Sequence, residues 1–260
     1  MNLVELNKVA EAMVAPGRGI LAADESTSTI KKRFDAIGVE STPITRRDYR
    51  EMLFRSGEAM SKHISGVILY DETIRQNAKD GTPLVKVIAQ DIVPIVEPEV
   101  LMDGEHDADR CATVSEWLLK TVFEQLYYQR VALEGMVLKP NMMVPGKKSP
   151  KRASVEEVAE KTLRVLKSCV PASVPGIAFL SGGQSDEEAT AHLDAINKLG
   201  PLPWRVTFSY GRALQAAPQK AWSGKPENVS TAQRAFGHRA SMNGLASLGK
   251  WKSDLERKAA

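Results

Sequence analysis

Residues 134–141, EGMVLKPN, place a lysine where an amine could do chemistry. Residues 136–138 are apolar and predict a short buried strand, with Lys139 at its end and Pro140 stopping it. Burial disfavours a charged ammonium, so such a lysine is poised to act as a neutral amine that attacks a carbonyl and forms a Schiff base. The alternative is a strand-terminal lysine that reaches solvent. Taken alone, the stretch favours a lysine that reaches solvent. The motifs in the rest of the chain decide between the two interpretations.

Two carboxylates, Glu97 and Glu99, flank Pro98 at the end of another apolar stretch. Side chains two residues apart on a strand point to the same side. Two carboxylates on one face repel, so at least one should be neutral or paired with a cation near neutral pH. This arrangement suits general acid–base chemistry or holding the charge of a lysine. A strand end with two solvated glutamates fits the spacing equally well.

Asp24 ends the first apolar stretch, and the hydroxyl residues Ser26 and Thr29 follow it. In one interpretation Asp24 faces the centre of a barrel while the hydroxyls bind a phosphate. In the other, the same residues form the N-cap of a helix with acidic neighbours, which is a common arrangement.

Two later loops are suited to an anion. Ser181 and Gly182 follow the fifth apolar stretch and open a helix, where exposed backbone N–H groups and the helix dipole favour negative charge. Gly211 and Arg212 follow the sixth, and a guanidinium can bind a phosphate through two N–H groups. With the lysine and carboxylates, these loops suggest cleavage or formation of a C–C bond beside a carbonyl. A protonated imine would be the electron sink, so we expect neither a metal nor another cofactor.

The elements that must position these residues alternate between strands and helices, which predicts an α/β fold with a parallel sheet. Reactive residues at the C-terminal ends of the strands favour a (β/α)₈ barrel. The alternative, a doubly wound sheet, is less favoured because no glycine-rich turn of the dinucleotide-binding kind follows the first strand. Helices are expected near residues 2–15, 111–131, 154–169, 185–199 and 228–248, with capping boxes at Ser154/Glu157 and Ser185/Glu188. Only six β/α units are visible, so the barrel is expected to be incomplete, in a single domain spanning residues 1–260.

Composition narrows the class of protein. The chain has 260 residues, 43% of them hydrophobic, and a net charge of +3, so we expect a sizeable core and no nucleic-acid or membrane partner. Two cysteines fit a reducing cytoplasm. The four histidines show no metal-ligand spacing. The basic residues 145–152 and the acidic residues 103–107 are interpreted as solvated loops.

The motifs APGRGILAADEST, GVILYDET, IVPIVEPEVLMDGEHD, LEGMVLKPNMMVPG, FLSGGQS and FSYGRALQ resemble class I (Schiff-base) fructose-bisphosphate aldolases almost end to end. The resemblance implies a (β/α)₈ barrel, usually a homotetramer. It also implies reversible cleavage of fructose 1,6-bisphosphate to dihydroxyacetone phosphate and glyceraldehyde 3-phosphate in glycolysis and gluconeogenesis. By the same resemblance Lys139 is the Schiff-base lysine, Glu97 the acid/base, Asp24 the active-site aspartate and Glu99 the carboxylate that supports the lysines. The phosphate-binding residues it implies are Ser181, Gly182, Gly211 and Arg212 for one phosphate, and Ser26 and Thr29 for the other.

One departure from the family falls between Gln90 and Asp91. Family members carry a third and a fourth strand there, with motifs like GIKVDKG and FAKWR, a second active-site lysine, an arginine beside it and a phosphate-binding lysine. If the chain truly lacks this segment, the barrel should be open or strained, with unpaired strand edges and weak or absent activity. The alternative function is then a catalytically weak or inactive phosphosugar-binding or scaffold protein. Otherwise the sequence omits a segment that the whole protein has, and the protein is an ordinary aldolase.

Overall fold

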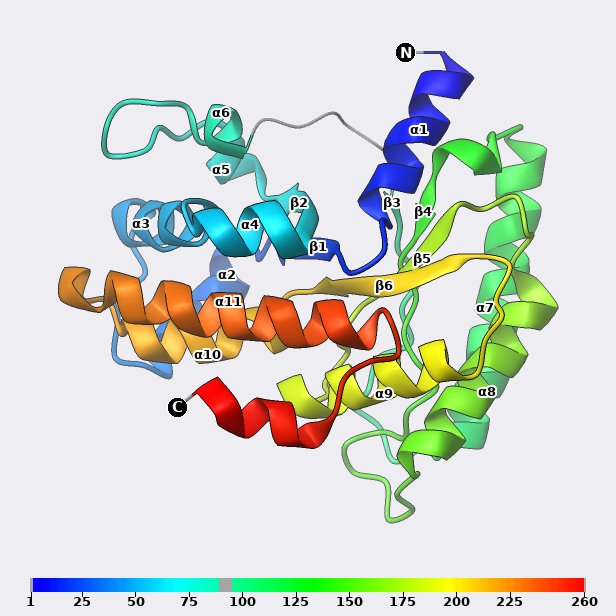
Figure 1. Ribbon diagram of the computed structural model, residues 1–260. Coiled ribbons are helices and arrows are strands. Elements are labelled where there is room, and N and C mark those ends of the chain that lie inside the picture. Colours follow the sequence, from blue (N-terminus) through cyan, green and yellow to red (C-terminus); the bar gives the residue numbers. More distant parts are fainter. Residues whose placement is uncertain (1, 89–94, 260) are drawn as a thin grey trace.

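The computed structural model describes residues 2–88 and 95–259; the junction between Gln90 and Asp91 lies outside them. Within these residues, six parallel strands form one curled sheet in the order β2-β1-β6-β5-β4-β3 (Figure 1). Their bounds are β1 Gly19–Ala23, β2 Ile64–Leu69, β3 Ile95–Val96, β4 Val137–Leu138, β5 Gly176–Phe179 and β6 Arg205–Tyr210. The predicted incomplete barrel of six units is therefore confirmed.

The strands on either side of the junction do not pair with each other in the described part of the chain. They form the two edges of the sheet, β2 beside β1 and β3 beside β4. Residues of both edge strands are partly exposed, whereas β1, β4 and β5 are buried along their whole length. Of the two expected consequences of a missing segment, the structure has the open sheet rather than a strained closed one.

Helices connect the strands and cover the outer side of the sheet (Figure 1). The longer helices are α1 Leu3–Met13, α2 Thr27–Asp35, α3 Pro43–Phe54, α4 Gly57–His63, α7 Ala108–Tyr128, α8 Val155–Cys169, α9 Asp186–Lys198, α10 Arg212–Trp222 and α11 Val229–Ala246. Short helices are α5 Asp71–Ile74, α6 Leu84–Ile88, η1 Leu133–Gly135, η2 Pro226–Asn228 and η3 Ser253–Ala259. All five expected helices are present, within a few residues of their predicted bounds.

The two predicted capping boxes have different outcomes. Ser185 and Glu188 form both reciprocal bonds at the start of α9, as expected. At the start of α8 the Ser154 hydroxyl accepts a bond from the Glu157 backbone N–H, but the return bond from the Glu157 side chain is not formed. The predicted box is therefore wrong at α8, where a simple serine cap satisfies the helix end.

The two faces of the sheet have different partners. Because side chains alternate along a strand, odd and even positions face opposite sides. Leu21, Leu138 and Phe179 lie in the large apolar cluster between the sheet and the outer helices. The concave face has a second, smaller cluster in which Ile20, Val137 and Ala178 pack against Ala10, Met13 and Val14 near the end of α1. The N-terminal helix thus fills the end of the concave face opposite the reactive residues.

Candidate active site

Lys139 leaves β4 on the concave face, two residues after Val137. Its backbone N–H donates to the carbonyl oxygen of Val96 at 2.8 Å, which fixes the end of β4 against β3. The side chain is buried, only 4% exposed, and its Nζ lies 2.9 Å from Oε1 of Glu97. The simpler interpretation, a lysine that reaches solvent, is therefore wrong for this structure.

Glu97 and Glu99 are in different electrostatic environments although they lie two residues apart. Glu97 pairs with the Lys139 ammonium. Partial burial and the negative charge of Glu97 raise the pKa of Glu99, against a smaller opposing effect of Lys139. This confirms the expectation that two carboxylates on one face need a cation or a proton. One of them is held as an ion-pair partner and the other is biased towards its protonated form.

Asn141 fixes the two strand ends relative to each other. This buried side chain accepts a bond from the Val100 backbone N–H at 2.9 Å and donates to the Ser115 hydroxyl at 3.2 Å. It thereby connects the segment after Glu99 with the segment after Lys139 and with helix α7. An amide can do this because it donates and accepts at once.

The two loops expected to bind phosphate meet in the structure. Ser181 is buried after β5, and Gly182 has a φ of +37°, a backbone conformation that disfavours a side chain. Gly211 caps α10, and Nη2 of Arg212 donates to the Gln184 carbonyl oxygen at 3.0 Å. A Cβ at Gly182 would also lie 4.0 Å from Oε1 of Glu99, so this loop adjoins the glutamates.

Arg33 is a further cation beside these loops that the sequence did not indicate. Its Nη2 would be 3.6 Å from a Cβ at Gly211, and its Nη1 forms an ion pair with the buried Glu25. Gln215 donates to the same Glu25 carboxylate at 2.8 Å. From sequence, an arginine that follows two lysines in a helix is expected on the surface. Only the fold shows that Arg33 lies beside these loops.

Ser26 and Thr29 form the cap of α2. The Ser26 hydroxyl accepts a bond from the Thr29 backbone N–H at 3.3 Å and donates to its hydroxyl at 3.0 Å. Asp24 is half-buried just before this cap. In residues 2–88 and 95–259 the hydrogen bonds of both hydroxyls stay within this turn, and neither hydroxyl forms a hydrogen bond with Lys139, Ser181 or Arg212.

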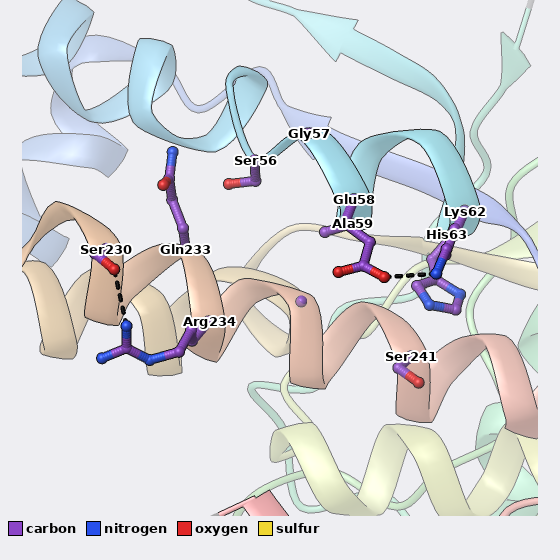
Figure 2. Close-up of a pocket in the computed structure, with 11 residues that line it drawn as sticks. Ser56, Gly57, Glu58, Ala59, Lys62, His63, Ser230, Gln233, Arg234 and Ser241 are labelled. Atoms are coloured by element: carbon purple, nitrogen blue, oxygen red, sulfur yellow. Dashed lines mark hydrogen bonds and ion pairs between the residues drawn. The ribbon is translucent and has the colours of Figure 1, made fainter.

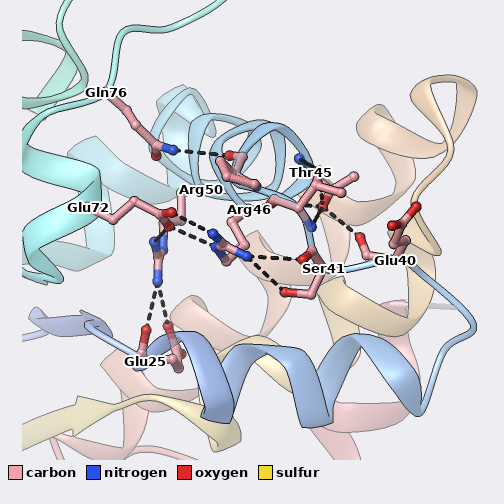
Figure 3. A network of polar contacts seen from close by, with 10 residues as sticks. Glu25, Glu40, Ser41, Thr45, Arg46, Arg50, Glu72 and Gln76 are labelled. Carbon is pink, nitrogen blue, oxygen red and sulfur yellow. Dashed lines mark hydrogen bonds and ion pairs between the residues drawn. The ribbon is translucent and has the colours of Figure 1, made fainter.

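A network of buried arginines with a buried and a partly exposed glutamate supports the end of β1 (Figure 3). Glu72 accepts two bonds from Arg46, at 2.8 and 2.5 Å, and these bonds hold the pKa of Glu72 below its ordinary value. Arg50 is 1% exposed and donates to the Glu25 carbonyl oxygen at 2.9 Å. The network connects α3 with the segments that follow β1 and β2, and it therefore positions Asp24 indirectly.

A polar groove between α4 and α11 lies apart from these residues (Figure 2). It has a volume of about 630 Å³ and contains none of the candidate residues. Its cations already have partners: Lys62 pairs with Glu58 at 2.5 Å, and Arg234 donates to the Ser230 hydroxyl at 2.8 Å. The candidate residues all lie outside this groove.

The part of the chain that the structure describes contains no cluster of three or more His, Cys, Asp or Glu side chains arranged to hold a metal ion. His192, one of the four histidines, is buried, and its ring nitrogen Nδ1 is hydrogen-bonded to the Gln184 side chain. Among these same residues, no helix combines the length and the apolar character needed to cross a bilayer.

Known proteins resemble this chain over nearly all of its length. The profile of the family described as "Glycolytic: Fructose-bisphosphate aldolase class-I" matches residues 5–91 and 88–260. The chain belongs to the class I fructose-bisphosphate aldolase family. The two matched parts of the profile meet at residues 88–91, where the sequence indicated a missing segment.

Individual aldolases are also similar over nearly the whole chain, and they contain positions that have no counterpart in it. A "Probable fructose-bisphosphate aldolase class 1" of Xanthomonas campestris pv. campestris is 42% identical over 334 positions, covering 97% of this chain and 100% of that protein. The "Fructose-bisphosphate aldolase" of Echinococcus multilocularis is 40% identical, covering 98% and 93%. Because this chain has 260 residues, at least 74 of the 334 positions have no residue of it opposite them.

A solved aldolase structure has the same fold. The aldolase of Plasmodium falciparum, in complex with TRAP and a small-molecule inhibitor, superposes with a TM-score of 0.91 at 36% identity, covering 96% of each chain. The six strands therefore keep the arrangement of an aldolase barrel although the sheet is open.

Proposed function

We propose that this aldolase cleaves fructose 1,6-bisphosphate reversibly to dihydroxyacetone phosphate and glyceraldehyde 3-phosphate through a Schiff base on Lys139. One observation carries the proposal: the Lys139 amine is buried on the concave face, 2.9 Å from Glu97. A buried amine beside a carboxylate can lose its proton to a neighbouring group and attack a ketone. The names of the relatives supply the substrate, and residues 1–260 would act as one domain.

In this mechanism the Lys139 nitrogen attacks the ketone carbon, and Glu97 donates the proton with which the oxygen leaves as water. The protonated imine then accepts the electron pair of the adjacent C–C bond when a base removes a proton from the neighbouring hydroxyl. Glyceraldehyde 3-phosphate departs and an enamine remains. Protonation of the enamine carbon and hydrolysis of the imine release dihydroxyacetone phosphate and restore the lysine. Glu97 would be the acid in imine formation and the base in C–C cleavage, and Glu99 and Asp24 would keep the charges of the site balanced.

The phosphates would be held at two places. Ser181 and Gly182, together with Gly211 and Arg212, would bind one phosphate, because their loops touch through Gln184 and offer backbone N–H groups and a guanidinium. Ser26 and Thr29 would bind the other, at the N-terminus of α2.

We also propose a homotetramer in the cytoplasm, without nucleic-acid or membrane partners. Helix α7 supports self-association because it exposes large aromatic side chains, Trp117 at 61% and Tyr127 at 79%. Cys111 and Cys169 are both free thiols, as is usual in a reducing compartment. Sedimentation equilibrium on the purified chain tests the tetramer.

Borohydride trapping tests the proposed chemistry. The chain is incubated with dihydroxyacetone phosphate, reduced with borohydride, digested and analysed by mass spectrometry. We expect a covalent adduct on Lys139, none in Lys139→Met, and no effect of a metal chelator. Lys148→Met is the matched control, because Lys148 is exposed on the basic loop. Binding of the ketose without an adduct would instead support the non-catalytic phosphosugar-binding alternative.

A further inference from the structure

We propose that Gln184 is a positioning residue that holds the Ser181–Gly182 loop against Arg212, and that His192 fixes the Gln184 side chain for this purpose. The inference rests on the proposed function, because that function assigns the two loops to one phosphate. It adds two residues, neither of which would touch substrate.

Gln184 binds both loops at once. Its side-chain Nε2 and its backbone N–H each donate to the Ser181 carbonyl oxygen at 3.0 Å. Its own carbonyl oxygen accepts the bond from Nη2 of Arg212, also at 3.0 Å. The residue is 6% exposed, so these bonds form away from water and are costly to leave unmade. A single buried residue therefore sets the distance between the serine–glycine loop and the arginine.

His192, on α9, determines how the Gln184 amide is oriented. Its Nδ1 lies 2.6 Å from Oε1 of Gln184. Because that oxygen only accepts, Nδ1 must carry a proton, and the amide nitrogen then points to Ser181. Burial lowers the pKa of His192 to about 4, although Glu188 and Glu156 act to raise it, so the ring is neutral at pH 7.

The loop borders an open space on one side. A cavity of about 180 Å³ lies behind it, lined by Gly182, Gly183, Gln184 and His192 among others. Without the two hydrogen bonds that Gln184 donates to the Ser181 carbonyl oxygen, the loop could move into this space. Arg212 forms no ion pair in the part of the chain that the structure describes, so its guanidinium keeps N–H groups for an anion. Holding both partners before the phosphate arrives reduces the entropy lost on binding.

The test measures phosphate binding by the complete chain. Inorganic phosphate is titrated while the amide signals of Gly182 and Gly211 are followed by NMR. We expect Gln184→Met to weaken binding about tenfold, because it removes both side-chain bonds at nearly constant volume. Gln219→Met is the matched control: Gln219 is equally buried, 6% exposed, but lies on α10 and its Nε2 has no partner. It should bind phosphate as the wild type does.

Two variants of His192 keep the test decisive if Gln184→Met does not fold. His192→Asn retains an N–H donor and His192→Leu does not. We expect His192→Leu to weaken phosphate binding about tenfold and His192→Asn to stay within about twofold of the wild type. A purely structural role would lower thermal stability in the leucine variant but leave its phosphate dissociation constant unchanged.

Each outcome decides a different point. Wild-type affinity in both Gln184→Met and His192→Leu, or no phosphate response at Gly182 in the wild type, would overturn the positioning role. The Lys139 borohydride adduct reports the proposed reaction separately. An adduct with unweakened phosphate binding in the variants defeats this inference alone. Weakened phosphate binding without an adduct defeats the proposed lyase alone and supports the positioning role.

Discussion

Glu99 reports the charges of its two neighbours, Glu97 and Lys139, and this gives a test at the scale of single residues. Glu97 raises its pKa and Lys139 lowers it. Glu97→Gln should therefore lower the pKa of Glu99, and Lys139→Met should raise it further. Carboxyl ¹³C titration by NMR measures both shifts, with Glu227→Gln on the η2 turn as a remote control. If neither variant moves the Glu99 titration, the charges are too far apart or too well screened to interact.

His192 should make the folding free energy depend on pH. Its pKa is 6.5 when unfolded and about 4 when folded, so the unfolded chain takes up a proton more readily. The stability is fully present above pH 6.5 and is lost as the pH falls towards 4, by up to about 3 kcal/mol. Urea unfolding at several pH values measures this loss.

His192→Asn should remove this slope and leave the remainder of the pH dependence. Burial also lowers the pKa of His63, which gives a slope of the same sign in both proteins and cancels in the comparison. Equal slopes for the wild type and the variant would show that His192 is not buried as described.

The residues with chemistry were partly predictable from sequence. Strand alternation predicted that Glu97 and Glu99 share a face. A reactive Lys139 was predicted only when its strand was considered together with the other motifs, because the strand alone favoured a lysine that reaches solvent. Gln184 and Arg50 were not predictable. A glutamine in a turn and an arginine in a helix are usually exposed, and their burial depends on contacts between segments distant in sequence.

At the scale of elements, the fit of α1 against the sheet depends on glycines that leave room for it, Gly176 among them. A Cβ at Gly176 in β5 would lie 2.5 Å from the side chain of Val14 at the end of α1. Gly176→Ala should therefore destabilise the fold by about 1–3 kcal/mol through overpacking. In a double-mutant cycle, Val14→Ala should recover part of this loss. Denaturant unfolding measures each value.

Gly57→Ala is the matched control for this cycle, because a Cβ at Gly57 would meet nothing within 4 Å. It should not destabilise the protein. Strictly additive losses at Val14 and Gly176 would show that the two residues do not press on each other.

Helices with clear apolar spacing and cap residues were predictable, as α9 shows with its Ser185 box. Helix α10 was not, because it begins directly at Arg212 without a side-chain cap and contains Pro218. The apolar residues 136–138 predicted β4 correctly. The strands β3 and β4 have only two residues each, so their exact bounds depend on pairing with neighbours in the sheet.

At the scale of the whole molecule, the open sheet separates β2 from β3 at opposite edges. The family resemblance implied a gap of two strands in this sequence, because the family motifs stop and resume at one junction. It could not reveal whether the sheet would close, since closure requires strand number, tilt and register to agree around the barrel. The aldolase superposition shows that the present strands keep their places instead of closing the gap.

Restoring the missing segment should therefore restore both closure and catalysis. We would insert the segment of the Xanthomonas campestris relative that has no counterpart here at the junction of Gln90 and Asp91. The new strands should protect the amides of β2 and β3 from hydrogen exchange, because edge strands leave backbone groups unpaired. The segment should also bring the lysines and the arginine that the family resemblance places there. Turnover of fructose 1,6-bisphosphate should then rise by about a hundredfold, as expected when charges that stabilise a transition state are added.

A glycine–serine linker of the same length, inserted at the same junction, is the control for this experiment. It adds chain without strands or cations, so neither hydrogen exchange nor turnover should improve. Equal turnover of the 260-residue chain and the restored chain would show that Lys139, the two glutamates and the phosphate loops suffice on an open sheet. Protection of β2 and β3 without a gain in turnover would instead assign the loss of activity to residues of this chain, with Ser26, Thr29 and Asp24 the first to examine. The experiment thus separates the contribution of barrel closure from that of the reactive groups already present.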